Sequence, residues 1–314
     1  MAYPEQAGQS SNQKQQPSGK KLMTNSFEKK HSDFNDWLNK QPLSADSVRS
    51  YSSRIKTLTQ FLVQRPEKYN DLTTETKDEI AKDFKQYLQL VLNAKPATIN
   101  AYIWGLNKYF DFLAIGHTTV ISEYVIARSP CSLNMLEQKT LLKAIERTKR
   151  AKDQAIMMMF LYTGIRISEC QKLATHDVFV FGPSARIVVR SRNGGAHREI
   201  PLNSSLCQVL QKWLVERREK YSGMSDAFFV NPQGRQLSAA SIDGIIRKIG
   251  RECGLNISAD KIRNTMLINL MNTSRDLALV ADIAGHRDLK TTARYQVHNA
   301  ADKANAIEQL LSHN

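Results

Sequence analysis

Two arginines near expected helix boundaries could bind an anion and take part in a reaction. Arg166 lies two residues after Gly164, where the apolar run MMMFLY ends, and just before Ser168 and Glu169, where a helix can begin again. An arginine within apolar sequence is costly to bury without an anionic partner. That partner is either an external anion such as a phosphate or the nearby Glu169, and this segment alone favours neither.

The second arginine, Arg263, lies three residues after Asp260 in the segment SADKIRNTMLINLM, at the expected start of a helix. This spacing puts both side chains on one side of the helix. The free N–H groups of a helix N-terminus and the fork of donors of a guanidinium both suit phosphate oxygens. A local Asp–Arg pair on the surface is the commoner meaning of the spacing, and it is the alternative interpretation.

A histidine and a tyrosine nine residues apart lie in a third segment, LVADIAGHRDLKTTARYQ. A helix is expected to end at Gly285, a typical C-cap residue, and His286 follows immediately. Tyr295 lies at the end of a short predicted helix. An imidazole can donate a hydrogen bond and a phenol oxygen can act as a nucleophile. Taken singly, His286 is more simply a capping residue and Tyr295 a half-buried aromatic residue, so only the combination points to chemistry.

In their order, spacing and expected local structure, the three segments together resemble the phage integrase or tyrosine recombinase family. Its members include the Xer chromosome-dimer resolvases, lambda integrase and Cre, and the resemblance extends from about residue 24 to the end of the chain. It implies that Arg166 and Arg263 are the two catalytic arginines and that Tyr295 is the nucleophile. His286 occupies a position that is His or Trp in the family, and the segment TTARY is similar to the family's TT-x-x-Tyr.

Two acidic residues are also assigned by this resemblance. Glu169, in the run GIRISE, matches an acid that supports the first arginine structurally in the family. Asp260 departs from the family pattern, because most members have His there, in a His-x-x-Arg motif. A carboxyl group cannot donate a proton at neutral pH unless its pKa is strongly raised. Asp260 could accept a hydrogen bond from the tyrosine hydroxyl or orient Arg263, and we favour the second role.

A second departure concerns the lysine that family members carry in the turn between the second and third strands of the catalytic domain. The corresponding segment, RSRNGGAHREIPL, contains no lysine, and alignment on its Arg198–Pro201 end puts Asn193 at that position. Arg192 lies beside Asn193, and an arginine stabilises charge but is a poor proton donor. His197, in the same hairpin, has a more suitable pKa. Arg192 and His197 are therefore both candidates for the general acid.

The spacing of apolar residues predicts a mainly helical scaffold for these side chains. Residues 22–115 have four amphipathic stripes and no strand signal, which predicts an all-α domain; by resemblance this is the DNA-binding (core-binding) domain. Residues 1–21 are expected to be a disordered tail and residues 116–133 a linker. The stripes are Phe34, Trp37 and Leu38; Val48, Tyr51, Ile55, Leu58 and Leu62; Ile80, Phe84, Tyr87, Leu88 and Val91; and Ile99, Tyr102, Leu106, Tyr109 and Leu113.

Residues 134–314 are predicted to form an α+β catalytic domain of the tyrosine recombinase type. Its helical stripes are interrupted by three short β-branched runs, VFVFG, ARIVVRS and HREIPL, which predict a small three-stranded antiparallel sheet. The turn Asn193–Gly195 makes a flexible loop between the last two strands. A C-terminal helix at about Ala301–Leu311 is predicted to pack either on its own domain or on a neighbouring protomer. Its apolar face holds Ala304, Ile307, Leu310 and Leu311.

The net charge of +14 points to a polyanionic partner, and its distribution indicates where that partner docks. Residues 22–115 have 13 Lys and Arg against 11 Asp and Glu, a net of +2, whereas residues 134–314 have 27 against 17, a net of +10. Phosphates are therefore expected on the second half. Four widely separated cysteines, and no apolar stretch suited to a membrane span or secretion signal, predict a cytoplasmic, DNA-associated protein.

The resemblance implies a site-specific recombinase that cuts and rejoins DNA through a 3′-phosphotyrosine intermediate, with no metal ion, ATP or other cofactor. Four protomers would act as a tetramer on two double-stranded recombination sites and pass through a Holliday junction. DNA integration, transposon resolution and dimer resolution all fit this chemistry. One alternative is a type IB-like topoisomerase, which uses the same nucleophile. The other is a DNA-binding relative with impaired catalysis, because the family lysine is missing.

Overall fold

The computed structural model describes residues 19–65, 68–69, 72–125, 129–190 and 198–296, with side chains from residue 28 onward. The chain divides into two compact units, Met1–Ile126 and Ala127–Asn314. Three predicted features lie outside the described residues: the hairpin turn with Arg192 and His197, the C-terminal helix, and the N-terminal tail except for residues 19–21, which belong to a helix.

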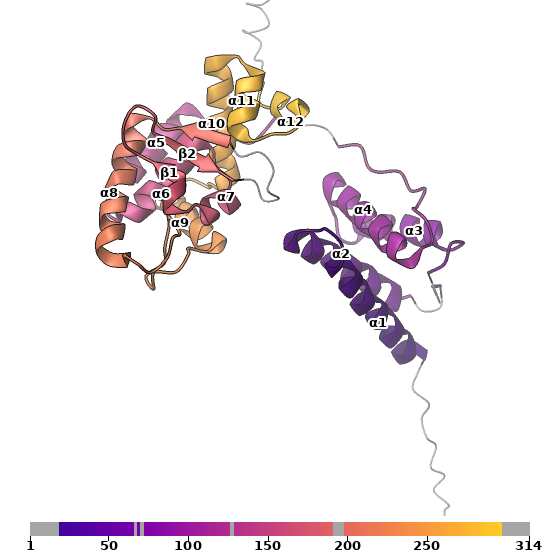
Figure 1. The fold of residues 1–314 in the computed structure, drawn as a ribbon. Helices are drawn as coiled ribbons and strands as arrows, with labels where there is room; N and C mark the ends of the chain where they lie inside the picture. The colour runs from indigo at the N-terminus through magenta and orange to yellow at the C-terminus, as the bar shows by residue number, and fades with distance from the viewer. Residues whose placement is uncertain (1–18, 66–67, 70–71, 126–128, 191–197, 297–314) are drawn as a thin grey trace, which may run out of the picture. The chain divides into compact units, whose positions relative to one another are not determined.

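The described part of the first unit is a bundle of helices (Figure 1). The four predicted stripes lie in four separate helices, and α4 packs against α1, α2 and α3. An edge-to-face contact between Phe34 and Tyr109, with ring centroids 5.0 Å apart, joins α1 to α4 in the buried core. The helices are α1 (Gly19–Asn39), α2 (Ala45–Val63), α3 (Lys77–Leu90) and α4 (Pro96–Leu113).

Residues 116–125, the first part of the predicted linker, contain no helix or strand but are bound to the first unit. The Asn100 side chain donates to the carbonyl oxygen of Glu123 at 2.8 Å and accepts from its N–H at 2.6 Å. The Thr118 hydroxyl donates to Asp78 at 2.6 Å. These contacts satisfy backbone and side-chain polar groups that an extended segment would otherwise leave to water.

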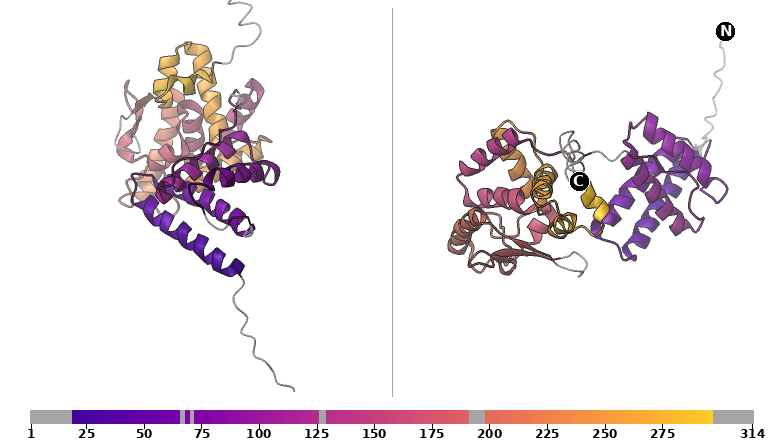
Figure 2. Two further views of the ribbon diagram at one scale, coloured as in Figure 1. Left: turned by 90° about the vertical axis from the view of Figure 1, so that its right-hand side faces the viewer. Right: turned by 90° about the horizontal axis from the view of Figure 1, so that it is seen from above.

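The second unit combines helices with a small sheet, as the sequence predicts (Figures 1 and 2). Its sheet is antiparallel with strand order β1-β2-β3, and Ile187 of β2 lies opposite Val178 on one side and Ile200 on the other. No helix in the described part of the chain is long and apolar enough to cross a membrane. In chain order the elements are α5 (Met135–Glu146), α6 (Ala151–Thr163), α7 (Ile167–Lys172), the 3₁₀ helix η1 (Thr175–Asp177), β1 (Val178–Phe179), β2 (Arg186–Val189), β3 (Arg198–Pro201), α8 (Ser204–Tyr221), α9 (Ala239–Glu252), α10 (Ala259–Ser274), α11 (Leu277–Ala284) and α12 (Leu289–Ala293).

Helix α6 is the centre of this unit. It packs against α5, α8, α9 and α10, and residues all around it, including Met157, Met159 and Phe160, are fully buried. A helix that is covered on every side needs no polar face, which explains the uninterrupted apolar run MMMFLY. The end of α6 therefore lies deep in the unit, and whatever follows it is held in place by core packing.

Two glycines end helices where the chain must turn beside another element. Gly164 after α6 and Gly285 after α11 have φ of +57° and +66°, a left-handed conformation that favours glycine. A Cβ at Gly164 would lie 3.1 Å from Sδ of Met266, and one at Gly285 would lie 2.6 Å from Nη1 of Arg198. These turns bring the residues after α6 against α10 and the residues after α11 against β3.

Candidate active site

Arg263 ties together the ends of two helices. Only 5% of its surface is exposed, and its guanidinium donates to the carbonyl oxygens of Gly164, at the end of α6, and Ala284, at the end of α11. Carbonyl groups at helix C-termini lack partners within their own helix, so these bonds satisfy them. Burial, followed by the positive charge of Arg166, lowers the pKa of Arg263 to about 10, and the side chain remains charged at neutral pH.

Asp260 does not take part in this arrangement. It is exposed in the first turn of α10 and has no hydrogen bond or ion pair with another described residue. The surface pair with Arg263 that the spacing allowed is not formed, because Arg263 points into the unit. The contacts that the expected role of Asp260 required, with Arg263 or with the hydroxyl of Tyr295, are also not made.

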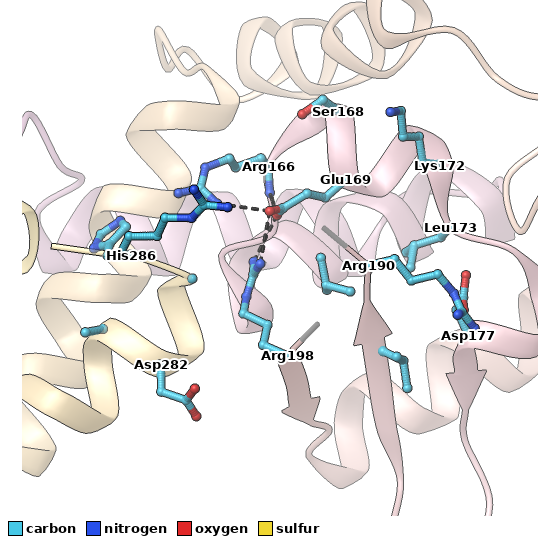
Figure 3. Close-up of a pocket in the computed structure, with 15 residues that line it drawn as sticks. Arg166, Ser168, Glu169, Lys172, Leu173, Asp177, Arg190, Arg198, Asp282 and His286 are labelled. Atoms are coloured by element: carbon cyan, nitrogen blue, oxygen red, sulfur yellow. Dashed lines mark hydrogen bonds and ion pairs between the residues drawn. The ribbon is translucent and has the colours of Figure 1, made fainter. Parts of the chain in front are cut away.

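Arg166 and Arg198 share one carboxylate (Figure 3). Glu169 accepts from Nη1 of Arg166 at 2.9 Å and from both terminal nitrogens of Arg198 at 3.0 and 2.9 Å. Burial raises the pKa of Glu169, but hydrogen bonds from Arg198 and from the Arg166 backbone outweigh it and lower that pKa to about 2. Glu169 is therefore a permanent anion that fixes two cations in place.

The ion pair with Glu169 leaves most N–H donors of the Arg166 guanidinium available to a ligand. Only Nη1 of its guanidinium meets the carboxylate, and 40% of the Arg166 side chain remains exposed. A guanidinium has five N–H donors, so most of them are free to meet an external anion. The internal partner that was the alternative to a phosphate is thus present, and it leaves the arginine able to bind one as well.

His286 is held by hydrogen bonds at both ring nitrogens. Nδ1 lies 2.9 Å from the hydroxyl of the fully buried Thr292, and Nε2 lies 3.2 Å from Nη2 of Arg263. A guanidinium can only donate, so Nε2 is the acceptor and Nδ1 carries the proton. Burial and the positive charges of Arg263 and Arg166 lower the pKa of His286 to about 4, which keeps the ring neutral at neutral pH.

Tyr295 is buried beside this histidine, with 8% of its surface exposed. The two rings stack with centroids 5.9 Å apart and planes 13° from parallel. The Tyr295 hydroxyl donates to Oδ1 of Asn264 at 3.2 Å, and Nδ2 of Asn264 donates to the carbonyl oxygen of Cys131 at 3.1 Å. The second bond orients the amide, so that its oxygen faces the tyrosine.

A cleft of about 610 Å³ opens onto this group of residues. Its walls come from α7, from β2 and β3, and from α11 with the turn that follows it, and Arg166, Glu169, Arg198 and His286 all line it (Figure 3). The cleft is rich in cationic side chains. Such a site suits an anion that several hydrogen-bond donors can reach at once.

The structure brings Arg166, Arg263, His286 and Tyr295 together and leaves Asp260 apart. Arg192 and His197 lie outside the described residues. Three further residues of the site were not singled out by sequence reasoning: Arg198, Asn264 and Thr292. Two of them adjoin or lie within the predicted motifs, Asn264 directly after Arg263 and Thr292 in TTARY, but their spacing did not show which contacts they make.

Comparisons with known proteins give this site a context. Residues 132–302 match the model of the phage integrase family. The chain is 24% identical over 289 residues to the TnP I resolvase of Bacillus thuringiensis, covering 88% of this chain and 98% of the relative. It is also 24% identical over 264 residues to the tyrosine recombinase XerC of Staphylococcus saprophyticus, covering 80% and 86%.

Solved structures share the fold. The XerH recombinase in a post-cleavage complex with a palindromic difH substrate aligns with a TM-score of 0.72 at 19% identity, over 95% of this chain and 90% of that one. A lambda integrase dimer bound to a COC′ core site aligns with a TM-score of 0.64 at 16% identity, over 87% and 96%.

The fold is shared with these solved recombinase structures, and the family model covers more than half of the chain. The chain belongs to the phage integrase family, the tyrosine-type site-specific recombinases.

Proposed function

We propose that this protein cuts and rejoins DNA at specific sites through a covalent bond between Tyr295 and a DNA phosphate. The observation that carries the proposal is the convergence of Arg166, Arg263, His286 and Tyr295 from three separate segments onto one cationic group of side chains. Membership of the family supports the same chemistry.

In the proposed reaction the scissile phosphate lies in the cleft against Arg166. The Tyr295 hydroxyl gives its proton to water, its oxygen forms a bond to phosphorus, and the bond from phosphorus to the 5′ oxygen breaks. The 5′ oxygen takes up a proton and leaves as a hydroxyl. Arg166 and Arg263 stabilise the negative charge that develops on the non-bridging oxygens. The phosphotyrosine bond retains the energy needed to rejoin the strand.

The contacts of Tyr295 and His286 fit a resting site that awaits this phosphate. The hydrogen bond to Asn264 uses the tyrosine proton and leaves the lone pairs of the hydroxyl oxygen free. An anion in the cleft would offset the arginine charges that lower the pKa of His286. His286 would then protonate more readily and donate a hydrogen bond to the phosphate.

The leaving 5′ oxygen needs a proton donor. We propose that this proton comes from the hairpin between β2 and β3, through Arg192 or His197. Lys261, the next candidate on α10, has its ammonium 3.5 Å from Glu137, a carboxylate that competes for it. The hairpin is therefore the first place to test.

We propose further that recombination requires four protomers on two duplexes and passes through a Holliday junction. The related structures support DNA as the partner, since XerH is bound to difH and lambda integrase is a dimer on a core site. The similarity to TnP I resolvase favours resolution over integration.

Two measurements test this proposal. A binding site is first selected from random-sequence duplexes, and a nick is introduced next to each candidate phosphate so that a cleaved strand end is lost. Wild-type protein should form a denaturation-resistant complex with one of these nicked duplexes. Exchange of strands between two intact copies of the site identifies a recombinase, whereas relaxation of supercoiled DNA without exchange identifies a type IB-like topoisomerase. Binding without any adduct would identify a relative that has lost catalysis.

A further inference from the structure

The cleft continues beyond the arginines and histidine of the proposed reaction. Lys172, at the end of α7, and Arg190, directly after β2, line it as well, and Figure 3 shows both on the opposite side of Glu169 from His286. Its volume of about 610 Å³ falls in the range of roughly 300–1,000 Å³ that accommodates a whole drug-sized ligand. A single phosphate group does not need so much space.

Arg190 is fixed by a buried acid, as Arg166 is. Its Nε donates at 2.8 Å to Oδ1 of Asp177, which is 3% exposed and whose other oxygen accepts from the backbone N–H of Ala174 at 3.0 Å. The Arg190 side chain as a whole is 65% exposed. Neither of its terminal nitrogens has a partner among the described residues. The cleft thus holds two arginines, each anchored by one nitrogen with its remaining donors open.

The charge at this end of the cleft favours an anion. Asp177 is offset by Arg190, while Lys172 is exposed and has no hydrogen bond or ion pair with another described residue. Glu169, the nearest further acid in Figure 3, is already paired with Arg198 and Arg166.

We propose that Lys172 and Arg190 form a second phosphate subsite, which binds the phosphodiester next to the scissile one on the cleaved strand. This inference rests on the proposed function, because the ligand is a DNA strand that runs along the cleft. Contacts to the DNA backbone set register and orientation. The subsite would therefore hold the strand so that one particular phosphate reaches Arg166 and Tyr295.

The test removes the charge of one phosphate at a time. Duplexes are selected for binding from a random-sequence pool, and each phosphate of one strand near the centre is replaced in turn by a neutral methylphosphonate. Affinity is measured in a Tyr295→Phe background, so that no cleavage interferes. The penalty that disappears with Arg166→Ala marks the scissile phosphate. A second penalty, at a neighbouring phosphate, should be about tenfold, and should fall below about twofold when Lys172→Ala and Arg190→Ala are combined.

Matched variants separate the subsite from general effects of charge and folding. Arg190→Gln keeps a donor for Asp177 and removes the charge, and it should reduce the neighbouring penalty as Arg190→Ala does. Arg247→Ala removes an exposed α9 arginine that also pairs with an aspartate, and it should leave the pattern of penalties unchanged. If the neighbouring penalty keeps its full size in the Lys172/Arg190 double variant, the subsite does not exist. Because duplexes are selected by binding, this outcome is independent of whether wild-type protein forms an adduct.

Discussion

The arginines of this site have structural contacts that suit the chemical role proposed for them. Arg263 satisfies two helix-end carbonyls and Arg166 pairs with Glu169, so both guanidinium groups are in place before any phosphate arrives. A preorganised donor stabilises developing charge without reorganising at the moment of reaction. Such arginines should contribute more to the transition state than to binding of the duplex, where many other cations share the backbone contacts.

Replacement of either arginine should therefore separate chemistry from binding. We expect Arg166→Ala and Arg263→Ala to slow single-turnover cleavage by at least about 10²-fold, while most of the duplex affinity remains. Arg263→Ala should also lower the thermal unfolding temperature, because it leaves the buried carbonyls of Gly164 and Ala284 without a partner. Equal losses of cleavage and affinity would make these residues ordinary phosphate anchors.

Asn264 should act through the position of the nucleophile. Its amide accepts from Tyr295 and is itself held by the carbonyl of Cys131. We expect Asn264→Leu, which keeps the size and removes both bonds, to reduce the cleavage rate about tenfold with unchanged duplex affinity. Asn264→Asp restores an acceptor for the hydroxyl and should recover part of the rate, with a changed dependence on pH. A cleavage rate in Asn264→Leu equal to that of wild type would show that this contact is incidental.

Which contacts of single residues could be predicted from the sequence depended on the direction in which each side chain points from its helix. Spacing, residue type and the family resemblance selected Arg166, Arg263, His286 and Tyr295. Sequence reasoning also named Glu169 as a possible partner of Arg166, and the structure shows that pair, but it did not find the partners of the other three. Asp260 shows the reason: residues three apart on a helix differ by about 60° in direction, and the edge of the buried face of α10 passes between Asp260 and Arg263. Alignment with a family motif shows which residue occupies which motif position. The contacts of that residue depend on its rotamer and on the packing around it.

At the scale of elements, the ends of helices α6 and α11 position the residues of the candidate site. The stripes and β-branched runs predicted the helices and the antiparallel sheet, because periodicity follows directly from burial on one face. Gly164 and Gly285 were predicted to end their helices, but the tight approach of Met266 and Arg198 to them was not, since such contacts join segments far apart in sequence. The turn between β2 and β3 lies outside the described residues, so the roles of Arg192 and His197 stay predictions.

A substrate whose leaving group needs no proton tests whether the hairpin supplies the general acid. We expect Arg192→Ala or His197→Ala to slow cleavage of ordinary DNA and to recover on DNA whose bridging 5′ oxygen is replaced by sulfur, because a thiolate leaves without protonation. Arg166→Ala should show no comparable recovery, since it removes phosphate stabilisation and not the acid. If both hairpin variants cleave ordinary DNA at the wild-type rate, the acid lies elsewhere, and Lys261 is the next residue to replace.

At the scale of the whole molecule, charge links DNA binding to stability. The net charge of +10 on residues 134–314 predicted that phosphates dock there, and the cationic cleft lies within that range. Burial, together with the same cluster of positive charges, lowers the pKa of His286 and so disfavours its protonation in the folded protein. The division into two units is close to the predicted linker, but composition could not show that residues 116–125 are bound to the first unit.

Acid should destabilise the second unit in a defined window. His286 has a pKa of about 4 in the folded protein, below its ordinary value of 6.5, so the unfolded chain binds the proton first and stability falls as the pH drops from about 6.5 to 4. For one proton the slope of the unfolding free energy is at most about 1.4 kcal/mol per pH unit.

Hydrogen exchange of peptides from α6 measures how the unfolding free energy of the second unit depends on pH. His286→Asn should flatten the slope, whereas His176→Asn, at an exposed histidine, should not; equal slopes in wild type and His286→Asn would contradict the assignment.

Mass spectrometry of the trapped complex shows whether Tyr295 forms the proposed covalent bond to DNA. Wild-type protein is trapped on a nicked copy of its selected site and digested with trypsin and nuclease, and the peptide that contains residue 295 is sequenced. We predict a nucleotide attached through its 3′ phosphate to Tyr295, and no adduct with Tyr295→Phe although that variant binds the same duplex. A nucleotide on any other residue, or an adduct that persists in Tyr295→Phe, would contradict the account.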